Sequence, residues 1–175
     1  MDLAVIPECY IDTNLIETLV KPNSRYNHQH GCGTVSKRMR ETFSNCFALG
    51  IIDKDKNEID YLKEFEIVYQ EGGVYLHKHT KLPHYIIQIS PAIEKFILTN
   101  AEQADIKLED YDLPSDLDAL KKLSKQIRSK DDQRFKQLFK VIQKAGSRDF
   151  HLIASWVNYL KENPYKADIR QLKNF

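Results

Sequence analysis

Two groups of acidic residues near the N-terminus each follow a short apolar run. Glu8 follows the run 3–7, and Asp53-Lys54-Asp55 follows the run 47–52. If both runs are neighbouring parallel strands, their carboxyl ends meet at one edge of the sheet, where open α/β sheets bind ligands. Carboxylates that converge need a cation, and their hard oxygen atoms suit Mg²⁺ or Mn²⁺. The sequence therefore predicts a divalent-metal site built from Glu8, Asp53 and Asp55.

The strands that must position these acids are predicted from short stretches rich in apolar residues, and the best of them, 47–52, does not alternate with polar residues. Such runs are typical of strands that are buried on both faces of a parallel sheet. The clearest runs lie at 47–52 and 84–89, and weaker ones lie at 3–7 and 65–69. Pro7 is expected to end the first strand or to lie at its edge, because proline cannot donate to a ladder of hydrogen bonds.

Helices are predicted where apolar residues recur at helical spacing. In the first part of the chain these segments are 14–20, 35–43 and 92–98. After Asp116 three further helical stripes follow one another. We therefore expect an α/β domain over residues 1–112, with a mostly parallel sheet flanked by helices, and a basic α-helical extension over residues 113–175.

The charge is distributed unevenly between the two parts of the chain. Residues 1–114 hold 12 Lys and Arg against 18 Asp and Glu, whereas residues 115–175 hold 14 against 7. An acidic front and a basic back are expected when one part holds metal and the other binds a polyanion such as DNA or RNA. A Lys-rich, solvated helical face is an equally good explanation.

Basic side chains in two places are candidates for binding a nucleic-acid backbone. Such contacts are dependent on salt and independent of base sequence. One group lies near a predicted helix start, and the other lies in the basic helices. The candidates are Lys37, Arg38, Arg40, Lys121, Lys122, Arg134, Lys136 and Lys140.

The cellular location is predicted from what the sequence lacks. No run of about 18 apolar residues is present, which predicts no transmembrane helix and no membrane partner. The N-terminus has no basic region of the kind that begins a signal peptide. The three cysteines show no CxxC spacing, which favours a reduced, cytoplasmic compartment.

The acidic motifs resemble those of the Toprim domain, which DNA primases, topoisomerases, OLD-type nucleases and small ribosomal RNA maturases share. That family has a strand ending in glutamate, often followed by Gly-Tyr-x-Asp, and a later strand ending in Asp-x-Asp. The segment 5–12, Val-Ile-Pro-Glu-Cys-Tyr-Ile-Asp, is similar to the first motif. The segment 50–55, Gly-Ile-Ile-Asp-Lys-Asp, is similar to the second, and Pro91-Ala-Ile-Glu94 looks like the Pro-x-x-Glu of nuclease-like members in bacterial phage defence.

The resemblance implies a role for each acid. Asp53 and Asp55 would bind Mg²⁺ or Mn²⁺, and Glu8 would be a general acid or base, or a further ligand. Asp12 would be an accessory acid that holds the loop or a second metal, although Asp12 or Thr13 could instead be only the N-cap of a helix. Glu94 would be functional, or else an exposed acid favoured by the helix dipole. The implied activity is a metal-dependent nuclease, with an ATPase as a partner protein.

Two departures and one rival resemblance leave alternatives open. Cys9 stands where the family usually has glycine, and Lys56-Asn57 replaces a Gly-rich continuation. A catalytically silent Toprim-fold module that binds nucleic acid or protein is therefore an alternative. The run Asp12-Thr13-Asn14 looks like the Asp-Thr-Asn of PIN-domain ribonucleases, which would make Asp12 the main ligand. If Pro7 and Glu8 end the first strand, Glu8 with Asp53 and Asp55 is the expected set of acids. If they lie within that strand, Asp12 is the expected main ligand.

Overall fold

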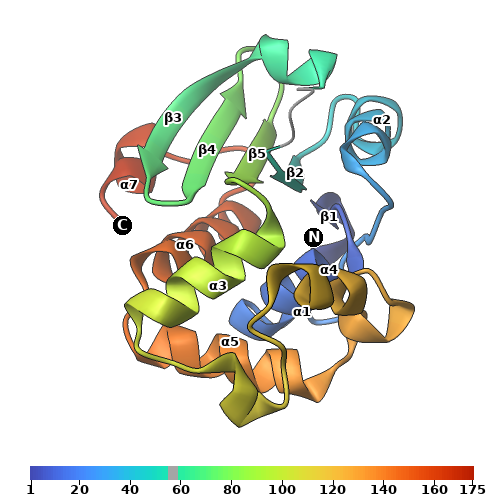
Figure 1. Cartoon of the computed structure of the whole chain (residues 1–175). Coiled ribbons are helices and arrows are strands. Elements are labelled where there is room, and N and C mark those ends of the chain that lie inside the picture. Colours follow the sequence, from blue (N-terminus) through green and yellow to red (C-terminus); the bar gives the residue numbers. More distant parts are fainter. Residues whose placement is uncertain (55–58) are drawn as a thin grey trace.

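The fold is built on a five-stranded mixed sheet with helices on both faces (Figure 1). It is described from a computed structural model that covers residues 1–54 and 59–175. The strand order is β1-β2-β5-β4-β3. The strands are β1 (Val5–Pro7), β2 (Ala48–Asp53), β3 (Phe65–Glu71), β4 (Val74–His79) and β5 (His84–Ile89).

Only one half of the sheet is parallel, which corrects the expectation of a mostly parallel sheet. β1, β2 and β5 run parallel to one another, whereas β4 is antiparallel to β5 and β3 is antiparallel to β4. Gly72 and Gly73 join β3 to β4, and only residues 80–83 join β4 to β5. Because a parallel crossover needs a dozen or more residues, these short connections allow only antiparallel pairing.

Alternate residues of the interior strand β2 pack on opposite faces of the sheet. Leu49 and Ile51 belong to the larger hydrophobic core, whereas Ala48 and Ile52 belong to the smaller core under α2 (Cys32–Thr42). A side chain at Gly50 would come within 3.0 Å of Met39, which explains the glycine at this close approach. The tip of β2 is therefore held from both faces.

The remaining helices pack mainly against the larger core (Figure 1). None of the helices in the described residues is long and apolar enough to cross a membrane. The sequence predicted most of these helices within a few residues, but it did not predict the last one. They are α1 (Tyr10–Leu19), α3 (Ile93–Gln103), α4 (Leu117–Ser124), α5 (Gln133–Lys144), α6 (Arg148–Glu162) and α7 (Ile169–Lys173).

One hydrophobic core contains side chains from both predicted parts of the chain. Leu15 and Ile16 of α1 belong to the same cluster as Leu138 of α5. The side chain of Asn14 also donates to the carbonyl of Ser129, over 2.8 Å between Nδ2 and O. The division at residue 112 stays a prediction, but the helices after it pack directly on α1.

Candidate functional site

The tips of β1 and β2 bring Glu8 and Asp53 together. β1 ends at Pro7, and Pro7 is paired with Ile51 of β2. The backbone N–H of Glu8 donates to the carbonyl of Ile51 over 3.0 Å. The backbone N–H of Asp53 in turn donates to Oε2 of Glu8 over 2.9 Å. The two acids predicted from separate motifs therefore lie side by side at the carboxyl ends of adjacent parallel strands, while Asp55 lies outside the described residues.

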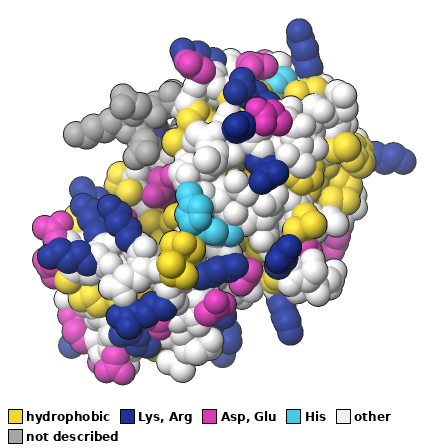
Figure 2. Space-filling view, turned by 90° about the vertical axis from the view of Figure 1, so that its right-hand side faces the viewer, with side chains coloured by type: hydrophobic (Ala, Val, Ile, Leu, Met, Phe, Trp, Pro, Cys, Tyr) yellow, Lys and Arg dark blue, Asp and Glu magenta, His cyan; other side chains and the backbone are white. Residues whose placement is uncertain are grey.

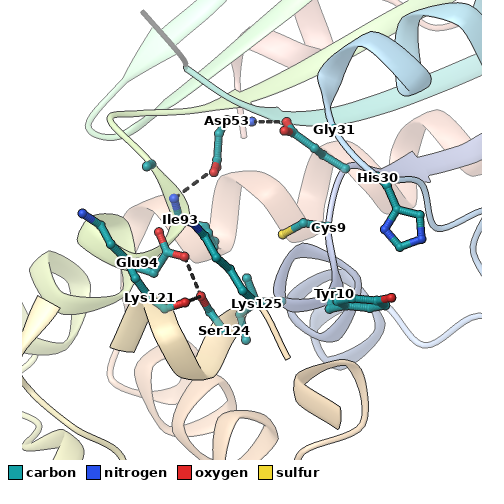
Figure 3. A pocket seen from close by; sticks show the side chains of 13 residues that line it. Cys9, Tyr10, His30, Gly31, Asp53, Ile93, Glu94, Lys121, Ser124 and Lys125 are labelled. Atoms are coloured by element: carbon teal, nitrogen blue, oxygen red, sulfur yellow. Dashed lines mark hydrogen bonds between the residues drawn. The ribbon is translucent and has the colours of Figure 1, made fainter. Parts of the chain in front are cut away.

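A pocket of about 450 Å³ opens at these strand tips (Figure 3). Glu8, Asp53 and Glu94 contribute three carboxylates to its lining. They come from the ends of β1 and β2 and from the first turn of α3. This place agrees with the general rule for ligand sites of open α/β sheets, since it is where the carboxyl ends of parallel strands meet.

Asp12 is a fully buried acid inside α1 and not a helix cap, which corrects the capping interpretation. The helix begins at Tyr10, with Cys9 as its N-cap, so Asp12 and Thr13 are both within the helix. Thr13 donates from Oγ1 to the carbonyl of Cys9. In the described part of the chain, neither carboxyl oxygen of Asp12 has a partner with the geometry of a hydrogen bond. The nearby Cys9 thiol nevertheless acts to lower the pKa of Asp12, against the larger effect of burial.

Burial and mutual repulsion raise the pKa values of two acids at this site, Asp12 and Asp53. Burial raises the pKa of Asp12 to about 8, and the charges of Glu8 and Glu94 act in the same direction. Burial also raises the pKa of Asp53 to about 9, together with the charges of Asp12 and Glu8. Like charges held out of water cannot all ionise without a compensating cation. Glu8, Asp12, Asp53 and Glu94 thus form one electrostatically linked acidic cluster.

Glu94 is buried, so the interpretation of an exposed first-turn acid is wrong. Its Oε1 accepts a hydrogen bond from Oγ of Ser124 over 2.6 Å. Asp53 lies at the same helix end, where its Oδ1 accepts from the backbone N–H of Ile93 over 3.1 Å. These two bonds connect the tip of β2, the start of α3 and the end of α4.

Lys121 of α4 and Lys125, the C-cap of that helix, complete the pocket on the side opposite Tyr10 and His30 (Figure 3). Lys121 and Lys125 both line it, whereas the neighbouring Lys122 is exposed and does not. Lys125 was not among the residues singled out from the sequence, and neither was Ser124. Their only signal was their place in a Lys-rich helical stripe, because the docking of α4 against α3 is a tertiary contact.

The other predicted nucleic-acid contacts lie away from this pocket. Lys37, Arg38 and Arg40 are exposed on α2, where Arg40 lies over the ring of Tyr61. Lys136 and Lys140 line a separate hollow with Glu17.

Arg134 is held by local contacts, although its side chain is 37% exposed. Its Nη2 is 2.6 Å from Oδ2 of Asp132, and its Nη1 donates to the carbonyl of Asp112.

Figure 2 shows one face of the molecule, on which Lys and Arg side chains lie around histidine and hydrophobic side chains.

The backbone at Cys9 does not need glycine. Its φ of −140° and ψ of 177° are extended values that any residue adopts. Burial strongly raises the pKa of the Cys9 thiol, and the charges of Asp12 and Asp53 act in the same direction. The thiol is therefore protonated and is a poor nucleophile. The departure from the glycine motif leaves the acids in place.

The chemistry of the acids suits a hard divalent cation, but the side chains are not arranged as a ligand set. Carboxylate oxygens are the ligands that Mg²⁺ and Mn²⁺ prefer, and the unpartnered oxygens of buried Asp12 fit such an ion. Among the described residues, however, no group of three or more His, Cys, Asp or Glu is positioned to hold a metal. Glu8, Asp53 and Glu94 instead accept the hydrogen bonds described above.

Comparisons of this chain with protein-family models, with curated proteins and with solved structures find no match.

Proposed function

We propose that this chain is a Mg²⁺- or Mn²⁺-dependent nuclease with a Toprim-like site. The observation that carries the proposal is the acidic cluster at the carboxyl ends of β1 and β2. Three carboxylates line one pocket, and behind them Asp12 is fully buried with no hydrogen-bond partner for either oxygen among the described residues. Such a concentration of acid is costly unless a cation compensates it.

Each acid has a distinct part in this proposal. Glu8 and Asp53 would hold the cation, and Asp55, Asp12 and Glu94 are further candidates from the same motifs. Such a cation stabilises negative charge on a phosphate and lowers the pKa of bound water. Glu8 would hold or move a proton, because its carboxylate lies at the open pocket beside Asp53.

The lysines of α4 support nucleic acid as the substrate. Lys121 and Lys125 line the same pocket as the acids. A phosphodiester carries a negative charge that Lys121 and Lys125 would attract. A cation held by the acids would stabilise the same charge. The pocket therefore offers both signs of charge that phosphoryl chemistry uses. A cytoplasmic location is part of this proposal.

The end of the first strand favours the Toprim-like set of acids over the PIN-like set. β1 ends at Pro7, so Glu8 is the residue at its tip. Asp12 lies within the first turn of α1, which differs from an aspartate that ends the first strand. Glu8 and Asp53 are accordingly proposed as the main pair, with Asp12 as a buried accessory acid.

A catalytically silent module is the second candidate, and one observation favours it. The carboxylates of Glu8, Asp53 and Glu94 already accept protein hydrogen bonds, and they are not placed as a ligand set. In a silent module these acids would serve only to join β1, β2, α3 and α4. Binding of a cation would distinguish the two, because the proposed enzyme needs a cation and a silent module does not.

Cleavage of labelled single-stranded DNA, RNA and duplex DNA with Mg²⁺ or Mn²⁺ tests the proposal. We expect cleavage that EDTA abolishes and that Glu8→Gln and Asp53→Asn reduce by 100-fold or more, on the order of the loss of a main catalytic group. Glu66→Gln is the matched control, because Glu66 is exposed on β3. Cleavage that survives both pocket substitutions would refute the assignment.

Titration calorimetry with Mn²⁺ separates the enzyme from the silent module. The wild-type protein should bind the ion, and Asp53→Asn should weaken that binding at least tenfold, since one charged ligand is lost. A protein that shows no heat of binding, and no cleavage of any of the three substrates, would support the silent module.

A further inference from the structure

Three aromatic rings lie together beside the acidic pocket. The rings of Tyr10 and His28 are stacked, with centroids 4.5 Å apart and planes at 17°. His30 meets both edge-on, at 5.3 Å from Tyr10 and 4.7 Å from His28. The distances and angles are those that aromatic groups prefer. These three residues are called the aromatic cluster below.

The chain path places both histidines on the same side. The segment before α2 runs along the outer edge of β1, where Asn27 N–H donates to Val5 and Gln29 N–H donates to Pro7. In an extended segment, residues two apart point the same way, so His28 and His30 both face α1. Tyr10 is the first residue of α1 and meets them there.

His28 is an uncharged ring that stacks against one face of the Tyr10 ring. The hydroxyl of Thr13 uses its one hydrogen on the carbonyl of Cys9, so Nδ1 of His28 must donate to that hydroxyl, over 2.9 Å. Its Nε2 is buried without a partner in the described residues. Burial, with the charges of His30 and Lys130, lowers the pKa of His28, which keeps the ring uncharged.

Tyr10 and His30 form the exposed side of the aromatic cluster. Both line the acidic pocket, whereas His28 does not. Figure 3 shows them on the side of the pocket that faces Lys121 and Lys125. The pocket thus combines acids, lysines and flat aromatic rings within about 450 Å³, a volume typical of small-ligand sites.

We propose that the aromatic cluster stacks against an unpaired nucleobase, and that the substrate is therefore single-stranded nucleic acid. This inference rests on the proposed function and names its substrate class. Acids and lysines account for the phosphate, but they leave no role for rings that line the same pocket. Aromatic side chains stack on bases of any sequence, and bases in a duplex have no free face. An unpaired nucleotide would place its base on Tyr10 and its phosphate between the acids and the lysines.

The first experiment uses the wild-type protein alone. A fluorescein-labelled 12-nucleotide deoxythymidylate strand is compared by anisotropy with the same strand carrying abasic tetrahydrofuran residues, and with a 12-base-pair duplex. Ca²⁺ replaces Mg²⁺ to prevent cleavage. We expect the strand with bases to bind at least tenfold more tightly than the abasic strand, and more tightly than the duplex. Equal binding of the strands, tighter binding of the duplex, or no binding would overturn the inference.

The second experiment assigns the effect to Tyr10. Tyr10→Ala should weaken binding of the deoxythymidylate strand about tenfold and leave binding of the abasic strand unchanged, whereas Tyr10→Phe should bind within twofold of wild type, because the ring remains. Tyr165→Ala is the matched control, since Tyr165 is exposed and contacts Phe47 at the opposite end of β2. Binding unaffected by Tyr10→Ala, in a protein with a wild-type circular dichroism spectrum, would overturn the assignment.

The two proposals fail in different ways. If base-dependent binding is found without cation-dependent cleavage, the nuclease fails and the stacking surface stands. If the protein cleaves duplex DNA as fast as a single strand, and Tyr10→Ala cleaves like wild type, the stacking surface fails and the nuclease stands.

Discussion

The carboxylate of Glu8 accepts a hydrogen bond from the backbone N–H of Asp53, over 2.9 Å between Oε2 and N. This bond joins the tip of β1 to the tip of β2 and fixes the distance between two acids that are 45 residues apart in the sequence. Parallel pairing of the strands makes the contact possible, because Pro7 is in register with Ile51. The positions of both acids therefore depend on the sheet rather than on a flexible loop.

The acidic cluster should make the metal-free protein less stable as the pH rises. Asp12 and Asp53 have pKa values raised far above those of the unfolded chain. For such groups the stabilising contribution is complete below the unfolded pKa, near 4, and is lost as the pH rises through the folded pKa. We expect the free energy of unfolding in EDTA to decrease between about pH 4 and pH 9.

Two comparisons identify the cause of this pH dependence. Between about pH 4 and pH 9 the free energy of unfolding of Asp12→Asn should fall by about 1 kcal/mol less than that of the wild type, or by a still smaller amount. One pKa unit is worth about 1.4 kcal/mol. Saturating Mn²⁺ should also make the decrease smaller, because a bound cation favours the ionised acids. Urea denaturation at several pH values measures both effects. A wild-type profile that is flat over this range would contradict the prediction.

Lys121 should contribute to nucleic-acid affinity more than its neighbour Lys122. Lys121 lines the pocket and Lys122 does not, so only Lys121 is placed to meet a phosphate. Lys121→Ala should reduce the slope of log K against log salt by about 0.7 for single-stranded DNA, the value for one lost phosphate contact. Lys122→Ala is the control on the same helix. Equal effects of the two substitutions, measured by anisotropy, would argue for a diffuse basic face instead.

Gly31 should be intolerant of a side chain, whereas Gly33 should accept one. Gly31 has φ of +91° and precedes α2, and its N–H donates to the carbonyl of Glu8. Gly33 lies within α2, and a Cβ at either position would meet nothing within 4 Å. The difference between them is therefore backbone strain alone.

We expect Gly31→Ala to lower the free energy of unfolding by about 1–3 kcal/mol, the cost of a non-glycine residue in this region of backbone conformation. Gly33→Ala should leave it unchanged or raise it by up to about 1 kcal/mol, because alanine favours a helix. Urea denaturation of the pair measures both. Similar losses of stability in the two variants would contradict this prediction.

The ion pair between Asp2 and Lys161 should stabilise the fold independently of the site. Oδ1 of Asp2 is 2.8 Å from Nζ of Lys161, and both side chains are largely buried. Asp2→Ala should cost about 3 kcal/mol, because it leaves a buried ammonium group without its partner. The double substitution Asp2→Asn with Lys161→Met should cost less than Asp2→Ala alone. A larger loss in the double variant would contradict this.

The same pair should give the protein a sensitivity to acid. Burial opposes ionisation of Asp2, but Lys161 and the backbone N–H groups of Ser24 and Asn23 outweigh it and lower its pKa. The stabilising contribution of a lowered pKa is present above the unfolded value, near 4, and is lost as the pH falls through the folded value. Thermal melting below pH 4 should show a smaller further loss in Asp2→Asn than in wild type.

The local pattern of the sequence predicted several elements correctly. The stretches 47–52 and 84–89 correspond to β2 and β5, which are interior strands and almost wholly buried. Short stretches rich in apolar residues are typical of strands covered on both faces. The order of the two acidic motifs then predicted that Glu8 and Asp53 would meet. The mixed sheet was not predicted, although the short connections 72–73 and 80–83 already excluded parallel strands there.

Tertiary structure alone decided the environment of the acids. Asp12 has the sequence context of a cap, but the start of α1 at Tyr10 places it inside the first turn of the helix, where solvent cannot reach its side chain. Glu94 and Ser124 are 30 residues apart, and nothing local indicates that α3 and α4 meet. Lys121 and Lys125 line the pocket only because α4 docks there. A sequence determines which groups can ionise, whereas burial and neighbouring charges, which exist only after folding, determine which of them do.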